Sequence, residues 1–84
     1  MRVLVTWGSR LGGTARIARL IREVLVSEGF EVVMAPVSAV RDVRGFHAAV
    51  IGGALYTNHW HRDVRRFVAH NDSELRRIPV WLFS

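Results

Sequence analysis

The chain has 84 residues, and it contains neither cysteine nor lysine. Without cysteine it forms no disulfide, no thiolate zinc site and no cysteine nucleophile. Without lysine it forms no Schiff base and no lysine-dependent phosphate loop of the Walker type. Several classes of enzyme are therefore excluded before any motif is considered.

Long apolar runs are also missing. None approaches the roughly 18 residues that a membrane-spanning helix needs, so we expect no transmembrane segment. The first residues have the pattern of a strand and not that of a secretory signal, which favours a cytoplasmic protein. Residues 1–84 are few enough for one small domain, and 50% of them are hydrophobic, which is typical of a globular chain.

The charge is unbalanced, with twelve basic residues, all of them arginine, against seven acidic residues and a net charge of +5. The arginines are spread along the chain, and no aromatic platform accompanies them. We therefore expect a solvated basic surface and no nucleic-acid partner.

Strand-like and helix-like segments alternate along the chain. A buried strand is predicted over residues 2–7, and further strands are predicted over residues 30–35, 47–53 and 80–84. One amphipathic helix is predicted from Thr14 to Gly29, and its apolar positions are Ile17, Leu20, Ile21, Val24 and Leu25. A second amphipathic helix is predicted from its apolar positions Trp60, Val64, Phe67 and Val68, and this helix could continue through Leu75. Residues 37–46 form a connection with room for one helical turn. This order predicts an α/β fold with a parallel sheet and right-handed crossovers.

The stretch WGSRLGGTARIA, residues 7–18, joins the first strand to the first helix. Its glycines let the backbone approach a ligand closely, and its two hydroxyl side chains are hydrogen-bond donors. Free N–H groups at a helix N-terminus bind anions, so the loop is a candidate phosphate site. The alternative is that the glycines only close a tight turn.

The spacing within VTWGSRLGGTARIARLI, residues 5–21, resembles the FMN-phosphate signature of flavodoxins. The matching positions are Trp7, Ser9, Gly12, Thr14, Ala18 and Ile21. The sequence departs from the signature at Thr6, which is usually apolar, and at Trp7, which is usually Phe or Tyr. Neither departure removes a phosphate donor.

A second stretch, from Gly45 to Ser84, resembles flavodoxin-like proteins grouped with menaquinone-dependent protoporphyrinogen oxidase. The shared features are a strand that ends in glycines, the triplet His59-Trp60-His61, and a helix followed by an aromatic strand. The resemblance implies a flavodoxin-like open parallel sheet in the order 2-1-3-4, truncated after strand 4. The chain would then be the N-terminal half of such a domain.

The resemblance also implies a cofactor, FMN, and the residues that bind it. The ribityl phosphate would lie on Ser9, Arg10, Leu11, Gly12, Gly13 and Thr14. The isoalloxazine ring would meet Ala54, Leu55, Tyr56, Thr57, Asn58 and Trp60. Arg10 could equally face solvent. Tyr56 is the better candidate for stacking on the ring, because Trp60 has helix partners in the periodic pattern and could pack in the core.

No catalytic residue and no metal site are predicted. His59, His61 and His70 lie near Asp63 in sequence, but their spacing defines no third metal ligand. Flavin chemistry needs no protein nucleophile, since the cofactor performs the redox step.

Two functions remain open. The first is an FMN redox protein, either an electron carrier or a quinone-linked oxidase of a porphyrinogen-type substrate. The sequence does not decide between these two, so whether the protein is an enzyme stays open. The second is a non-catalytic half-domain that assembles without a cofactor. In both cases the apolar segment Val80-Trp81-Leu82-Phe83 predicts a homo-oligomer or a partner chain joined through strand 4.

Overall fold

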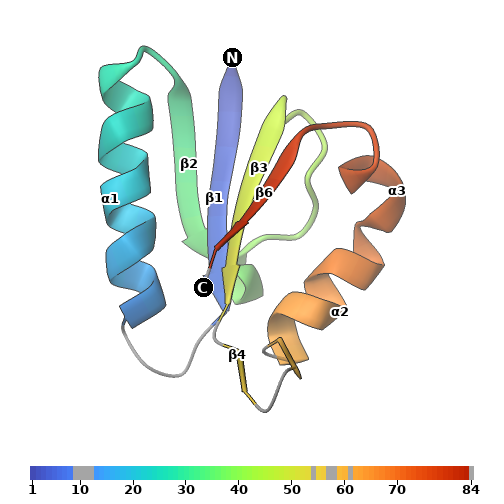
Figure 1. Cartoon of the computed structure of the whole chain (residues 1–84). Coiled ribbons are helices and arrows are strands. Elements are labelled where there is room, and N and C mark those ends of the chain that lie inside the picture. The colour runs from blue at the N-terminus through green and yellow to red at the C-terminus, as the bar shows by residue number, and fades with distance from the viewer. Residues whose placement is uncertain (9–12, 54, 57–58, 61, 84) are drawn as a thin grey trace.

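The core of the protein is a four-stranded, all-parallel sheet with helices on both faces (Figure 1). The computed structural model describes residues 1–8, 13–53, 55–56, 59–60 and 62–83. The sheet has the order β2-β1-β3-β6, which is the predicted order 2-1-3-4. Its strands are β1 (Arg2–Gly8), β2 (Glu31–Pro36), β3 (Ala48–Gly53) and β6 (Val80–Phe83).

Helices and short elements connect these strands. They are α1 (Gly13–Ser27), the 3-10 turn η1 (Val37–Ala39), the two-residue strands β4 (Leu55–Tyr56) and β5 (His59–Trp60), α2 (Arg62–His70) and α3 (Asp72–Leu75). The single helical turn that we expected in residues 37–46 is therefore η1. None of the helices in the described part of the chain is long and apolar enough to span a bilayer.

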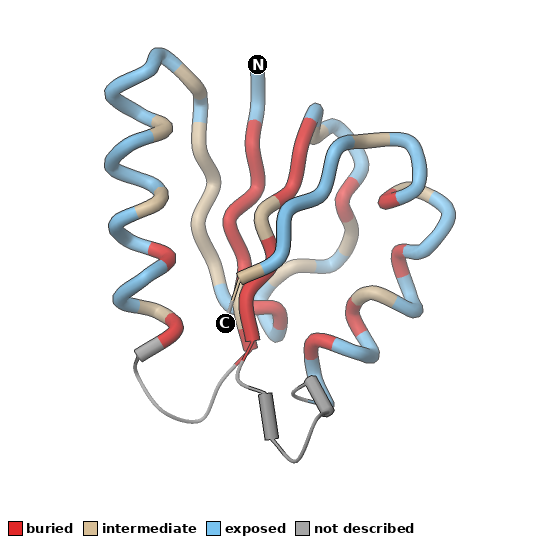
Figure 2. The backbone as a smooth tube through the Cα atoms, viewed as in Figure 1, coloured by how far each residue is buried: buried red, intermediate tan, exposed pale blue. Residues whose placement is uncertain are grey.

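Strand β1 is central, and its side chains alternate between two hydrophobic clusters, as the two-residue period of a strand requires. Val3 and Val5 pack on the side of α1, with Ala18. Leu4 packs on the opposite side, with Val64 and Phe67 of α2. Both faces of β1 are thus covered, which explains its nearly continuous apolar sequence. The buried residues of Figure 2 accordingly concentrate in β1 and β3.

The predicted apolar stripe of α1 was partly wrong. Ala18, Ile21 and Leu25 face the sheet. Ile17, Leu20 and Val24 are instead 38%, 58% and 62% exposed. The helix carries more apolar positions than one sheet face covers, and the sequence alone does not say which flank is turned outward.

The second helix of the structure, α2, differs from the predicted helix in two places. Trp60 lies in β5 and not in the helix, because the helix begins only at Arg62. The helix also breaks at Asn71, whose φ of −106° and ψ of 18° are not helical. The Asn71 side-chain Nδ2 donates to the Phe67 carbonyl at 2.9 Å, and its backbone N–H donates to the same oxygen at 3.0 Å. Residues 72–75 therefore form a separate turn, α3.

Candidate functional site

The candidate site lies at the carboxyl edge of the sheet, between β1 and β3. In Figure 1 these strands end at the lower side of the molecule, where α1 and α2 begin. After β1 the chain continues to α1 on one face, and after β3 it continues to α2 on the other face. Such a divergence is a topological switch point, and ligands of open α/β sheets bind in the crevice outside it.

The two strands end side by side in glycine. Gly8 of β1 pairs with Gly53 of β3, and both residues are buried. Neither residue has a Cβ atom, so no side chain at these two positions would hinder the close approach of a ligand to the backbone.

The N-terminus of α1 faces the same edge and is suited to an anion. Its first residue is Gly13, and Thr14 in its first turn is only 7% exposed. The first turn contains no acidic side chain, and it contains the exposed Arg16. A cation at this end opposes the helix dipole, which an anion near the free N–H groups would compensate.

Thr6 adds a buried polar atom close to this edge. The residue is fully buried on β1, two positions before Gly8. Its Oγ1 atom has no hydrogen-bond partner among the described residues. A buried hydroxyl without a partner is costly, so its presence here is a feature that packing does not explain.

The structure describes only part of the predicted cofactor-binding set. Ser9, Arg10, Leu11, Gly12, Ala54, Thr57 and Asn58 lie outside the described residues, as does His61 of the histidine triplet. Gly13 and Thr14 begin α1. The backbone of Leu55 pairs with that of Trp60, and Tyr56 pairs with His59, in an antiparallel ribbon that follows β3. Tyr56 and Trp60, the two aromatic residues predicted to contact the isoalloxazine ring, thus belong to one two-stranded ribbon.

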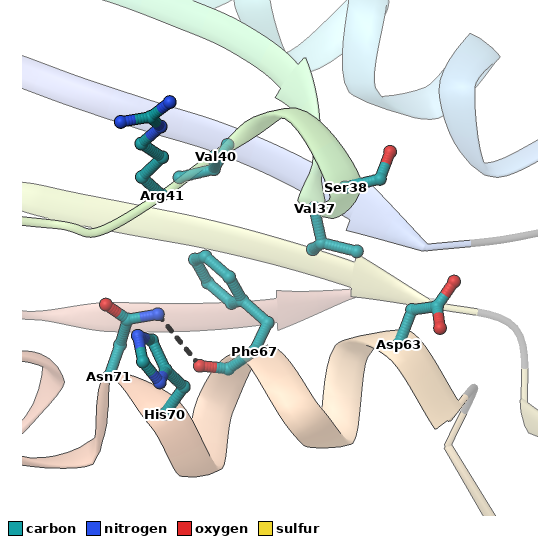
Figure 3. Close-up of a pocket in the computed structure, with 8 residues that line it drawn as sticks. All are labelled: Val37, Ser38, Val40, Arg41, Asp63, Phe67, His70 and Asn71. Atoms are coloured by element: carbon teal, nitrogen blue, oxygen red, sulfur yellow. Dashed lines mark hydrogen bonds between the residues drawn. The ribbon is translucent and has the colours of Figure 1, made fainter.

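A separate groove of about 300 Å³ runs between η1 and α2 (Figure 3). Its floor contains Val37 and Phe67, and its rim includes Arg41, Asp63 and His70. Asp63 and His70 lie at opposite ends of α2, seven residues or about 10 Å apart along the helix axis. This separation along the helix is too large for the two side chains to act as an acid–base pair.

Metal-ligating side chains do not cluster in residues 1–8, 13–53, 55–56, 59–60 and 62–83: no group of three histidines or carboxylates is placed to hold an ion. His70 ends α2, whereas His59 lies in β5, so the two histidines belong to different elements.

Sequence reasoning missed that the Thr6 hydroxyl, which is fully buried, has no hydrogen-bond partner among the described residues. The only available signal for Thr6 was its polar side chain within an otherwise apolar strand.

The sequence matches the flavodoxin domain family over residues 4–84. The match spans almost the entire chain and agrees with the parallel sheet and its strand order. The chain therefore belongs to the flavodoxin domain family. No curated protein matches it.

Proposed function

We propose that the protein is an FMN-binding redox protein whose cofactor lies across the carboxyl edge of the sheet. It would act as an electron carrier or in the quinone-linked oxidation of a porphyrinogen-type substrate, as the resemblance to the protoporphyrinogen oxidase group suggests. Membership of the flavodoxin domain family supports a flavin-binding role.

The proposal is carried by three features that lie together at the switch point: the ends of two strands and the N-terminus of one helix. Gly8 and Gly53 end adjacent strands without side chains. The α1 N-terminus, with the buried Thr14 and no acidic group, begins at the same edge. A phosphate fits a helix N-terminus, and a flat ring fits a glycine-lined strand edge.

The two predicted segments would then bind different parts of the cofactor. The phosphate would be held by residues 9–14, with Thr14 donating its hydroxyl and the first N–H groups of α1 pointing at the same oxygens. The ring would lie against the segment 54–60, with Tyr56 as its stacking partner. The bound flavin supplies the redox chemistry, while the protein binds it, orients it and limits its contact with water.

The test compares FMN with riboflavin, which has the same ring but no phosphate. Thr14→Ala should weaken FMN binding about 10- to 100-fold, the loss of a hydrogen bond to a charged group, and leave riboflavin binding nearly unchanged. Ser27→Ala is the matched control, because Ser27 lies at the other end of α1, where its Oγ donates to the Val24 carbonyl. Fluorescence quenching of the flavin measures both affinities. Equal FMN affinity in the Thr14→Ala protein and the wild type would contradict the phosphate assignment.

A second candidate function, assembly without a cofactor, is favoured by the exposure of β6. Trp81 and Leu82 are 58% and 61% exposed, and β6 pairs only with β3 among the described strands. Apolar cavities of about 430 and 340 Å³ lie on its two sides, one lined by Leu82 and the other by Trp81. An edge strand of this kind associates readily with other chains.

The two candidates are separated by two measurements on the purified protein. A flavin absorption band that persists through gel filtration supports the redox function. A colourless oligomer, dissociated by Leu82→Lys, supports assembly alone. Sedimentation at tens of micromolar gives the oligomeric state, and a monomer would contradict association through β6.

A further inference from the structure

One side of helix α1 presents three adjacent aliphatic residues to solvent. Ile17, Leu20 and Val24 lie within about 60° of one another around the helix, and all three are exposed. In Figure 2 most of α1 is accordingly coloured as exposed. Single apolar residues are ordinary on a protein surface, whereas a contiguous apolar patch is typical of a site of association. We call these three residues the outer face of α1.

The outer face is continuous with the apolar cavity of about 340 Å³ between α1 and β6. Ile21 of α1 lines this cavity. It lies four residues after Ile17 and three before Val24, so the three side chains are neighbours on the helix surface. Trp81 of β6 lines the same cavity and is 58% exposed. One apolar surface therefore extends from Leu20 to Trp81, on the side of the sheet that carries α1.

The other border of the outer face carries two opposite charges. Arg16 and Glu23 lie about 40–60° beyond Leu20 around the helix, and both are exposed. They are seven residues, or about 10 Å, apart along the helix axis, which is too far for an ion pair within one chain. Neither takes part in an ion pair with another described residue. Both charges can therefore pair with a second molecule that docks on the outer face.

We propose that the outer face of α1 is an interface between two copies of this chain, whose α1 helices pack antiparallel across a two-fold axis beside Leu20. Such an axis brings together residues that lie about equally far before and after Leu20. Ile17 then packs against Val24 of the partner subunit, and Arg16 lies opposite Glu23 of the partner subunit. The pair of opposite charges forms twice.

The charge pattern selects a second copy in this orientation. A parallel arrangement would place Arg16 level with Arg16 of the partner subunit, and like charges at a helix interface oppose association. In the antiparallel arrangement the same two residues of one chain are complementary to themselves, as a two-fold interface requires. This interface uses the surface of a helix and not the unpaired backbone of β6, and it does not depend on flavin binding.

The natural chain has no cysteine, which permits a direct test by disulfide formation. Leu20→Cys places two thiols beside the two-fold axis. Val26→Cys is the matched control, because Val26 is 48% exposed on the same helix but lies about 120° around it from Leu20. Under mild oxidation the Leu20→Cys protein should form a covalent dimer at least about tenfold faster than the Val26→Cys protein. Equal rates would overturn the proposal.

Sedimentation equilibrium measures the interface in solution, and Leu82→Lys removes association through β6 from the measurement. The wild type and the Leu82→Lys protein should both dimerise at about 100 micromolar. Adding Leu20→Glu should weaken dimerisation about 100-fold or more, because a leucine is lost from each copy, whereas adding Val26→Glu should not. Glutamate is a good helix former at this exposed position, and circular dichroism checks that the fold is retained. A Leu82→Lys protein that is monomeric at this concentration would show that the outer face does not join two copies.

Exchange of the two charges tests the antiparallel orientation. Arg16→Glu and Glu23→Arg each bring like charges together, and each should weaken dimerisation about three- to tenfold at low salt. The double variant restores opposite charges and should regain the affinity of the wild type. If its loss instead equals the product of the two single losses, Arg16 and Glu23 do not meet across the interface, and the proposal is wrong.

Discussion

Replacing Thr6 by valine should stabilise the protein, although it removes a polar group from the centre of the sheet. Thr6 is fully buried, and its hydroxyl oxygen has no hydrogen-bond partner in the described part of the structure. Valine has the same branched shape, so the substitution leaves no cavity and requires no new backbone conformation. The change therefore isolates the cost of burying one hydroxyl group.

The expected size follows from that cost. An unsatisfied buried hydroxyl destabilises a folded protein by about 1–3 kcal/mol, and Thr6→Val should recover about that amount. For a domain of 84 residues, 1 kcal/mol corresponds to a rise in Tm of about 4–8 °C. The urea midpoint should rise while the slope of the transition stays constant, because the surface exposed on unfolding is unchanged.

Urea and thermal unfolding of the flavin-free protein, followed by circular dichroism, measure the effect. Val5→Thr is the reciprocal control, because Val5 is the neighbouring, fully buried residue of the same strand and faces the opposite side of the sheet. It should destabilise the protein by a similar amount. If Thr6→Val is no more stable than the wild type, the Thr6 hydroxyl has a stabilising interaction in solution, and the reasoning is refuted.

Three further predictions concern a buried amide, a left-handed turn and the flavin ring. Asn71→Ala should lower the free energy of unfolding by about 1–3 kcal/mol, measured in urea, because the buried Asn71 amide hydrogen-bonds to the Phe67 carbonyl; a change below 0.5 kcal/mol would contradict this. Gly29→Ala should cost about 1 kcal/mol by thermal unfolding, because Gly29 has a φ of +92°, and an unchanged or higher Tm would show that this conformation is not required. Tyr56→Ala should reduce quenching of bound flavin more than Trp60→Ala, and the reverse order would exchange the roles of these two aromatics.

The order and type of the main elements were predictable from local chemistry. Short apolar runs separated by amphipathic segments predict alternating strands and helices, and a helix between consecutive strands favours parallel strands joined by right-handed crossovers. The glycines and hydroxyls after the first strand indicated an anion site, because a helix N-terminus next to a strand end presents free N–H groups. The predicted order of the elements was confirmed by the sheet order β2-β1-β3-β6 and by a helix α1 that begins at Gly13. The anion site remains a prediction.

Tertiary structure decided which of several similar residues are buried. Apolar side chains cover much of α1, and in the folded protein Ala18, Ile21 and Leu25 pack against the sheet while Leu20 and Val24 are exposed. The contact of Phe83 with Gly52 joins residues 31 positions apart and depends on the pairing of β3 with β6. That the Thr6 hydroxyl has no hydrogen-bond partner among the described residues likewise depends on what packs around it. The apolar pattern of the sequence shows which residues can be buried. The neighbours that bury them are determined only when the helices pack on the two faces of the sheet.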